Sequence, residues 1–171
     1  MCNRGQYGMG GHLWDEMLRG TRSFLIQLPI SNLAATTVAR FSDTSSLGDM
    51  IYYVCMFDFM VFTIHYMFHA IPWLYDNIHH EHHKTMHVTP FSATILDWKE
   101  HILIGVIPTI VPLYMCNMTT VTWTVANFMI FIHGMAIHSN LRLPYDNYLL
   151  GSKEHATHHR YKQTHIGFLL P

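Results

Sequence analysis

Hydrophobic residues gather in four segments along the chain, separated by short polar stretches. The segments cover about residues 23–41, 50–74, 102–116 and 121–138. A helix needs about 20 apolar residues to cross a bilayer. Residues 50–74 reach that length, whereas the last two segments are shorter and could form a tilted hairpin that only dips into the membrane. The pattern predicts an all-α integral membrane protein with about four transmembrane or deeply inserted helices.

Two domain-level predictions accompany this pattern. Residues 1–22 are polar and rich in glycine, and residues 23–171 would form a single membrane domain. The N-terminal stretch lacks the compact apolar run and small-residue cleavage site of a secretory signal. A buried helical hairpin in a soluble protein is the alternative, but the polar loops are too few to cover these segments.

The basic residues fall unevenly between the loops. With four crossings, nine of them lie on one side of the membrane and only Arg40 lies on the other. Because cytoplasmic loops are enriched in Lys and Arg, both termini are predicted to be cytosolic. The nine are Arg4, Arg19, Arg22, Lys84, Lys99, Arg142, Lys153, Arg160 and Lys162.

Composition supports the membrane prediction and excludes other classes. Half of the residues are hydrophobic and 12% are charged, against about 25% charged in soluble domains. The net charge of −1 and the absence of a basic face argue against nucleic acid as a partner. Cys2, Cys55 and Cys116 are odd in number and far apart, which favours a reducing compartment.

The histidines form repeated boxes near the ends of the apolar segments. His65 and His69 are four residues apart and would share one helix face. A His-x-x-His-His pattern follows in "HHEHH" (79–83) and recurs in "HATHH" (155–159), which contribute His79, His82, His83, His155, His158 and His159. Between them lie His133 and His138. In the predicted topology these residues form a histidine-rich helical cap on the cytosolic side.

So many imidazoles indicate a metal site. Imidazole is a neutral ligand for iron, zinc, copper and nickel. Eight to ten of them exceed the four ligands of a tetrahedral zinc, but could fill most of the coordination of two six-coordinate metals. A zincin motif is excluded because Lys84 occupies the position of its second histidine. Isolated histidines such as His12, His87 and His101 are expected to be ordinary surface or core residues.

At residues 50–168 the sequence resembles the fatty acid hydroxylase/sterol desaturase superfamily of membrane-bound, non-haem di-iron oxygenases. The matching stretches are "DFMVFTIHYMFHAIPWLYDNIHHEHH", "TPFSATILDWKEHIL", "HSNLRLP" and "HATHHRYKQTHIGF". Two departures stand out. Asp97-Trp98 replaces the usual His-Pro, and His165-Ile166-Gly167 replaces Asn-Tyr-Gly or Asn-Phe-Gly. The chain also lacks the Trp-Asp and Phe-Gly that normally close the domain.

The resemblance implies an O2-dependent hydroxylase or desaturase acting on a membrane lipid of sterol or fatty acyl type. Two iron ions would be the cofactor, and zinc could replace them in a purified sample. No side chain need act as a nucleophile, because the metal centre carries the chemistry. The implied ligands are His65, His69, His79, His82, His83, His138, His155, His158 and His159, with His133 as a tenth.

Further residues and partners follow from the same resemblance. Carboxylates should orient the ligand rings, and the candidates are Asp58, Asp76, Glu81, Glu100 and Glu154. The N-terminal segment shows no fused haem domain, so electrons are expected from a separate donor, such as cytochrome b5 with its reductase. That donor suggests the endoplasmic reticulum.

Two alternatives remain open at this point. One is a histidine-rich membrane protein that binds or transports a transition metal, although transport sites usually lie near the bilayer midplane. The other is a non-catalytic or truncated family member that keeps the fold and uses its histidines structurally or as a pH-responsive cluster.

Overall fold

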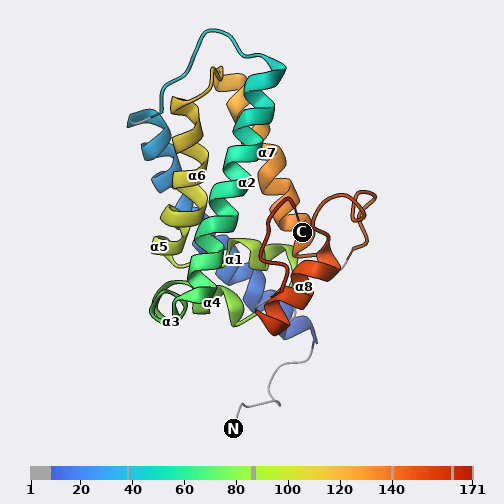
Figure 1. Ribbon diagram of the computed structural model, residues 1–171. Coiled ribbons are helices and arrows are strands. Elements are labelled where there is room, and N and C mark those ends of the chain that lie inside the picture. The colour runs from blue at the N-terminus through green and yellow to red at the C-terminus, as the bar shows by residue number, and fades with distance from the viewer. Residues whose placement is uncertain (1–8, 38, 86–87, 140, 163, 171) are drawn as a thin grey trace.

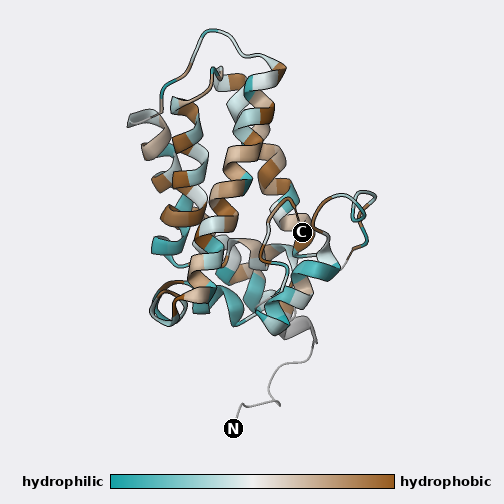
Figure 2. Ribbon diagram, viewed as in Figure 1, coloured by the Kyte–Doolittle hydropathy of each residue, from teal (hydrophilic) through white to brown (hydrophobic). Residues whose placement is uncertain are grey.

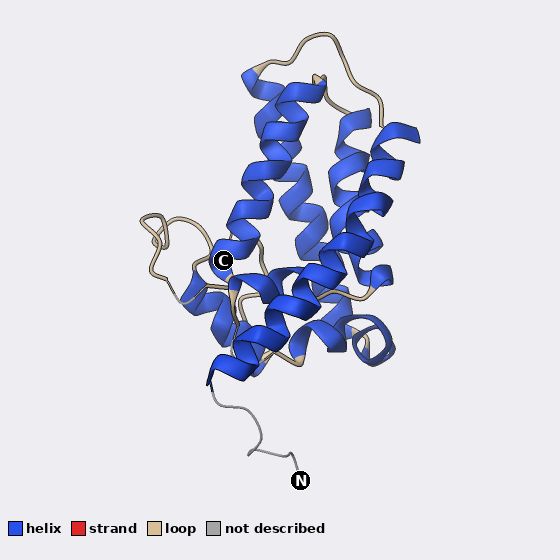
Figure 3. Ribbon diagram, turned by 180° about the vertical axis from the view of Figure 1, so that it is seen from behind, coloured by secondary structure: helices blue, strands red, loops and turns tan. Residues whose placement is uncertain are grey.

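Every regular element in the described part of the chain is helical, as the sequence predicts (Figure 3). The computed structural model describes residues 9–37, 39–85, 88–139, 141–162 and 164–170. Two long helices, α1 (Met9–Thr37) and α2 (Leu47–Ala70), are followed by a set of short ones and then by α7 (Thr120–Ile137) and α8 (Ser152–Tyr161).

The described residues of the four predicted apolar segments lie mostly in helices, and each of these four helical stretches is called a pass below. The third pass is a succession of short pieces: α5 (Trp98–Glu100), η3 (His101–Val106), α6 (Ile107–Ile110) and η4 (Val111–Tyr114). Helix α1 begins at Met9 and runs through position 22, so the predicted start of the membrane domain at residue 23 does not coincide with a helix break. The passes run alternately up and down (Figure 1).

The two ends of the bundle differ in character. Residues 39–46 and 115–119 connect the passes at one end, whereas α4 (His80–His83) and α8 lie at the other (Figure 1). Helices α2, α6 and α7 consist largely of hydrophobic residues, whereas hydrophilic residues dominate α4 and α8 (Figure 2). The histidine boxes therefore lie at the polar end.

Local sequence signals explain where α2 begins and ends. Ser46 and Asp49 form a capping box, in which each side chain accepts a hydrogen bond from the other residue's backbone N–H. The helix ends at Ala70, and the next residue, Ile71, has the extended backbone that is favoured before a proline, here Pro72. The chain then turns through α3 (Pro72–Leu74) and η1 (Tyr75–His79), which bring the second histidine box back towards the end of α2.

Two described helices, α2 and α7, are long and apolar enough to cross a membrane, judged by length and composition. Only 17% of the most apolar window of each is buried, and side chains such as Phe59, Phe62, Phe128 and Met129 face outward. A core helix of a soluble protein would be largely covered, so these faces suit lipid. The other two passes do not contain a continuous apolar helix long enough to cross a membrane. Polar residues interrupt the apolar run of α1, and the third pass is divided into four short helices. The four crossings remain a prediction.

A small core joins the passes at the end away from the histidines. Tyr53, Leu113, Met118 and Ala126 are buried together there. The Tyr53 hydroxyl donates to the backbone carbonyl of Thr109 (3.0 Å), and the indole of Trp123 donates to the same carbonyl (3.0 Å). These bonds link α2, α6 and α7 and leave the histidine end free for a site.

Candidate metal centre

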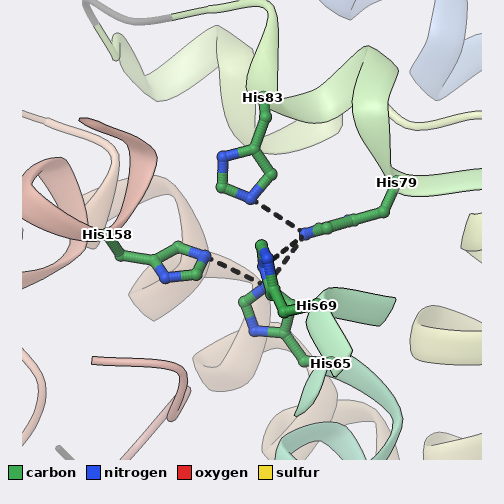
Figure 4. A group of neighbouring side chains, drawn as sticks. All are labelled: His65, His69, His79, His83 and His158. Atoms are coloured by element: carbon green, nitrogen blue, oxygen red, sulfur yellow. Dashed lines mark hydrogen bonds between the residues drawn. The ribbon is translucent and has the colours of Figure 1, made fainter. Parts of the chain in front are cut away.

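Five histidines from three parts of the chain form the first group (Figure 4). His65 and His69 come from the end of α2, His79 and His83 from η1 and α4, and His158 from α8. Their Nε2 atoms approach within 3.0 Å for His65–His79 and His79–His83, and 3.2 Å for His65–His158. One ligand atom from each ring lies within 4.8 Å of all the others.

Four histidines form the second group: His82, His138, His155 and His159. The Nε2 atoms are 3.4 Å apart for His82–His138, 3.0 Å for His138–His155 and 3.2 Å for His155–His159. All four residues are buried. The rings come from α4, the end of α7 and α8, which lie far apart in the sequence.

Helix periodicity divides each His-x-x-His-His box between the two groups. Residues four apart lie almost above one another on a helix, whereas a residue three apart lies to the other side of that line. His79 and His83 accordingly join the first group, and His82 joins the second. In α8 the division is reversed, with His155 and His159 in the second group and His158 in the first.

The two groups are neighbours. The ring centroids of His83 and His159 are 4.8 Å apart, those of His79 and His82 are 5.5 Å apart, and those of His82 and His83 are 5.6 Å apart. The site is therefore one continuous patch of imidazoles with two centres of convergence.

Backbone carbonyls and one carboxylate fix the orientation of five rings. Nδ1 lies 2.8 Å from a carbonyl oxygen for His65 (Ile166) and His158 (Thr164), and 2.7 Å for His138 (Gly134). The other two partners are the carbonyl of Thr85 for His159 (3.1 Å) and the Glu100 carboxylate for His79 (2.6 Å). Carbonyl oxygens only accept hydrogen bonds, so Nδ1 carries the proton and the lone pair of Nε2 points inward.

Burial keeps these rings neutral. It lowers the pKa of His138 and of His158 to about 4. It also lowers the pKa of His82 and of His155 well below the ordinary value, and the neighbouring imidazoles add to the effect. Neutral imidazole is the form that binds a metal ion.

This donor set fits metal ions. Lone pairs that face one another at 3.0 to 3.4 Å repel unless a cation lies between them. With metal–nitrogen bonds of about 2.1 Å, neighbouring ligand atoms are about 3.0 Å apart at right angles and about 3.4 Å apart at tetrahedral angles. The observed separations fall in this range, so both groups have the spacing of metal ligands.

His133 departs from the sequence prediction. Its Nε2 lies 2.9 Å from the Phe168 carbonyl, and its ring packs against Phe168 and Tyr145. It belongs to neither group. The reason is its position on α7, where the five-residue spacing to His138 turns the two side chains to different faces. His133 is therefore removed from the proposed ligands.

Of the five carboxylates expected to orient rings, Glu100 contacts a ring of the two groups. Asp58 instead accepts a hydrogen bond from the backbone N–H of Leu169 (2.7 Å), and Glu81 pairs with Lys84. Asp76 is exposed, and within the described part of the chain neither Asp76 nor Glu154 contacts a ring of the two groups. Backbone carbonyls orient most of these rings. Because every residue has a backbone carbonyl, residue types in the sequence do not indicate which carbonyls take this role.

A cavity of about 610 Å³ opens beside the histidines. Its walls are mainly apolar and include Phe57, Val61, Ile104, Phe128 and Phe131. Rings from both groups form part of the lining: His65, His79, His82, His138 and His155. The volume is within the usual range of small-molecule sites, about 300–1,000 Å³. The cavity can therefore hold an apolar molecule against the histidines.

Comparison with known families agrees with this geometry. The family model described as fatty acid hydroxylase matches residues 50–171, which is more than half of the chain. The chain belongs to the fatty acid hydroxylase family. No curated protein and no solved structure gave a match. The resemblance noted from the histidine boxes is thereby confirmed, and membership of this hydroxylase family suggests a membrane-associated oxidoreductase that hydroxylates or desaturates a lipid.

Proposed function

We propose that the protein is a membrane-bound oxidoreductase that uses O2 to hydroxylate or desaturate a sterol or fatty acyl type lipid. The observation that carries the proposal is the convergence of nine neutral imidazoles in two adjacent groups beside an apolar cavity. Family membership supports the same reaction class.

Two iron ions are the proposed cofactor. The first would be held by His65, His69, His79, His83 and His158, and the second by His82, His138, His155 and His159. Five and four imidazoles are fewer ligands than six-coordinate iron accepts, so open positions remain. Bound iron would supply the activation of O2 that an unactivated C–H bond requires. Zinc could replace iron in a purified sample, since imidazole binds both.

The side chains of this chain have two tasks in the reaction. The apolar wall binds the hydrocarbon and excludes water, and it presents one carbon to the histidine-lined part of the cavity. The Nδ1 partners hold the rings in one tautomer and one orientation.

The position of the histidines at one polar end of the helical bundle supports a membrane location. A lipid would enter the cavity from a bilayer beside α2 and α7, while the histidine end and both termini would face the cytosol. Electrons would come from a separate protein, such as cytochrome b5 with its reductase, at the endoplasmic reticulum.

A pair of neighbouring histidines gives the sharpest test. His82→Ala removes a buried member of the second group, whereas His80→Ala changes an exposed ring that belongs to neither group. We expect wild type and His80→Ala to retain two irons per chain and to consume O2 with lipid extract. His82→Ala should lose at least one iron and the O2 consumption. Iron is measured by mass spectrometry and products by lipidomics.

Two outcomes would contradict the proposal. One is a folded wild-type protein that binds no metal when it is purified with iron supplied. The other is a fully loaded protein that converts no sterol or fatty acyl lipid in the presence of O2 and a reductant.

A further inference from the structure

Within the proposed lipid oxidation, we propose that Ser31, Glu100 and His101 form a polar subsite in the cavity that binds a hydroxyl or carbonyl group of the substrate. The carbon that is oxidised would then lie close to the polar group of the lipid and not at the far end of its chain. The inference rests on the proposed function.

The first observation is an unsatisfied carboxylate oxygen. Glu100 lines the cavity and is 1% exposed. Its Oε1 lies 2.6 Å from Nδ1 of His79, whereas its Oε2 is buried and has no hydrogen-bond partner among the described residues. A buried polar atom left without a partner costs about 1–3 kcal/mol. A polar group of a ligand would provide that partner.

The second observation is a polar pair that lines the same cavity. The Ser31 hydroxyl and Nε2 of His101 are 2.9 Å apart, and both residues line the cavity. A hydroxyl can donate one hydrogen bond and accept two, so Ser31 keeps capacity for a ligand whichever way the pair is protonated. Glu100 is the sequence neighbour of His101, which places the three polar side chains on adjoining elements, α1, α5 and η3.

The backbone makes room for the His101 ring. Gly105 follows it by four residues in the π-helical segment η3, and a Cβ added at Gly105 would lie 2.8 Å from Nδ1 of His101. A side chain at this position would therefore displace the ring. Short π-helical segments are rare and occur frequently at functional sites.

Polar residues elsewhere in the cavity are already occupied. The Asn127 side-chain NH2 donates to Tyr53 Oη and to the Trp123 carbonyl. The hydroxyl of Thr109 donates to the Val106 carbonyl and that of Thr124 to the Thr120 carbonyl. Asn127 also precedes His138 by eleven residues, about 16 Å along an α-helix. The polar end of a lipid is thus expected beside Glu100, which contacts His79 of the first group.

The geometry fits two lipid classes that share this chemistry, a sterol with its hydroxyl group and an acyl chain with a terminal hydroxyl or carbonyl. Equilibrium binding of radiolabelled lipids to the iron-loaded protein, kept without O2, separates them. One arm compares octadecan-1-ol with octadecane, and the other compares cholesterol with the analogue that lacks its hydroxyl group.

In at least one arm, wild type should prefer the hydroxylated lipid by about tenfold, the effect of one net hydrogen bond. Ser31→Ala and His101→Phe should reduce the preference to about twofold or less, with iron content and hydrocarbon binding unchanged. His101→Gln should restore part of it. Gly105→Ala should also lower it, although both polar side chains remain. Thr36→Val is the control, because Thr36 is exposed on the same helix.

The inference is overturned if neither pair of lipids is discriminated by wild type. It is also overturned if the preference survives Ser31→Ala and His101→Phe but is lost in Asn127→Leu. Failure of the proposed function would appear differently, as missing iron or missing lipid oxidation, because the binding measurement needs no turnover.

Discussion

At the residue scale, His165 and Asp97 differ from the residues usual in the family, but each suits the backbone conformation at its position. His165 has φ of 52°, in the left-handed region, where asparagine and histidine are both enriched among non-glycine residues. The exchange of the usual asparagine for His165 is therefore compatible with this turn. Asp97 accepts a hydrogen bond from the N–H of Lys99 and caps α5, a position that favours aspartate.

The buried imidazoles predict how stability depends on pH. The pKa of His138 and of His158 is lowered by burial from 6.5 to about 4, so the unfolded chain binds more protons between these values. The free energy of unfolding of metal-stripped protein should be greatest above about pH 6.5. It should fall by about 1.4 kcal/mol per pH unit for each group as the pH decreases towards 4.

Thermal unfolding in detergent, followed by circular dichroism between pH 7.5 and 5, measures this dependence. His138→Gln should reduce the slope, because one of the titrating groups is gone. An unfolding temperature that does not change between pH 7.5 and 5 would contradict the prediction. Bound metal should also be released as the pH decreases, since protons compete with the metal for the ligand nitrogens.

At the scale of elements, the segment 164–169 closes the site although it forms no helix. Its carbonyls at Thr164 and Ile166 face His158 and His65, and the Phe168 ring packs on Phe57 of α2 at 5.7 Å. Asp58 holds the segment to α2 through the N–H of Leu169. Asp58 therefore acts on the metal site through this segment, as a positioning residue.

Asp58→Ala should loosen the C-terminal segment and weaken metal binding. Removal of an outer partner of a metal ligand typically costs 10- to 100-fold in affinity, and we expect the lower part of that range because Asp58 acts indirectly. Competition with a chelator measures the affinity, and hydrogen exchange at residues 164–169 measures the loosening. Asp76→Ala, at an exposed carboxylate, should change neither. Lower affinity with unchanged exchange would refute the positioning role.

At the scale of the whole molecule, the polarity of the two ends predicts a topology. Residues 39–46 contain Arg40 alone among the basic residues, whereas Lys84, Lys153 and Arg160 belong to the histidine end. The outward apolar faces of α2 and α7 lie between these ends. This arrangement predicts that the bundle crosses a membrane, with its two ends in different aqueous compartments.

Single cysteines introduced into a chain without Cys2, Cys55 and Cys116 test this topology. Ser45→Cys and Lys153→Cys should react with a membrane-impermeant maleimide from opposite sides of sealed microsomes, with Lys153→Cys labelled from the cytosolic side. Full activity of both variants would show that the fold is intact. Labelling of both positions from one side would refute the crossing.

The sequence by itself determined the helical class, the apolar passes and the histidine boxes, because these depend on local periodicity and on residue type. The spacing of His79, His82 and His83 predicts that all three lie on one side of a helix. Only the structure shows that His82 joins the second group while the other two join the first. Nine of the ten expected histidines converge, and this convergence depends on how helices distant in the sequence pack together.

Only the tertiary structure decided the rest. The contact of His133 with the Phe168 carbonyl, the contact of His65 with the Ile166 carbonyl and the pairing of Glu100 with His79 join residues that are 35, 101 and 21 positions apart in the chain. The cavity likewise arises from the gaps between four passes. Such contacts are set by how the helices pack in three dimensions, and local sequence patterns contain no record of that packing.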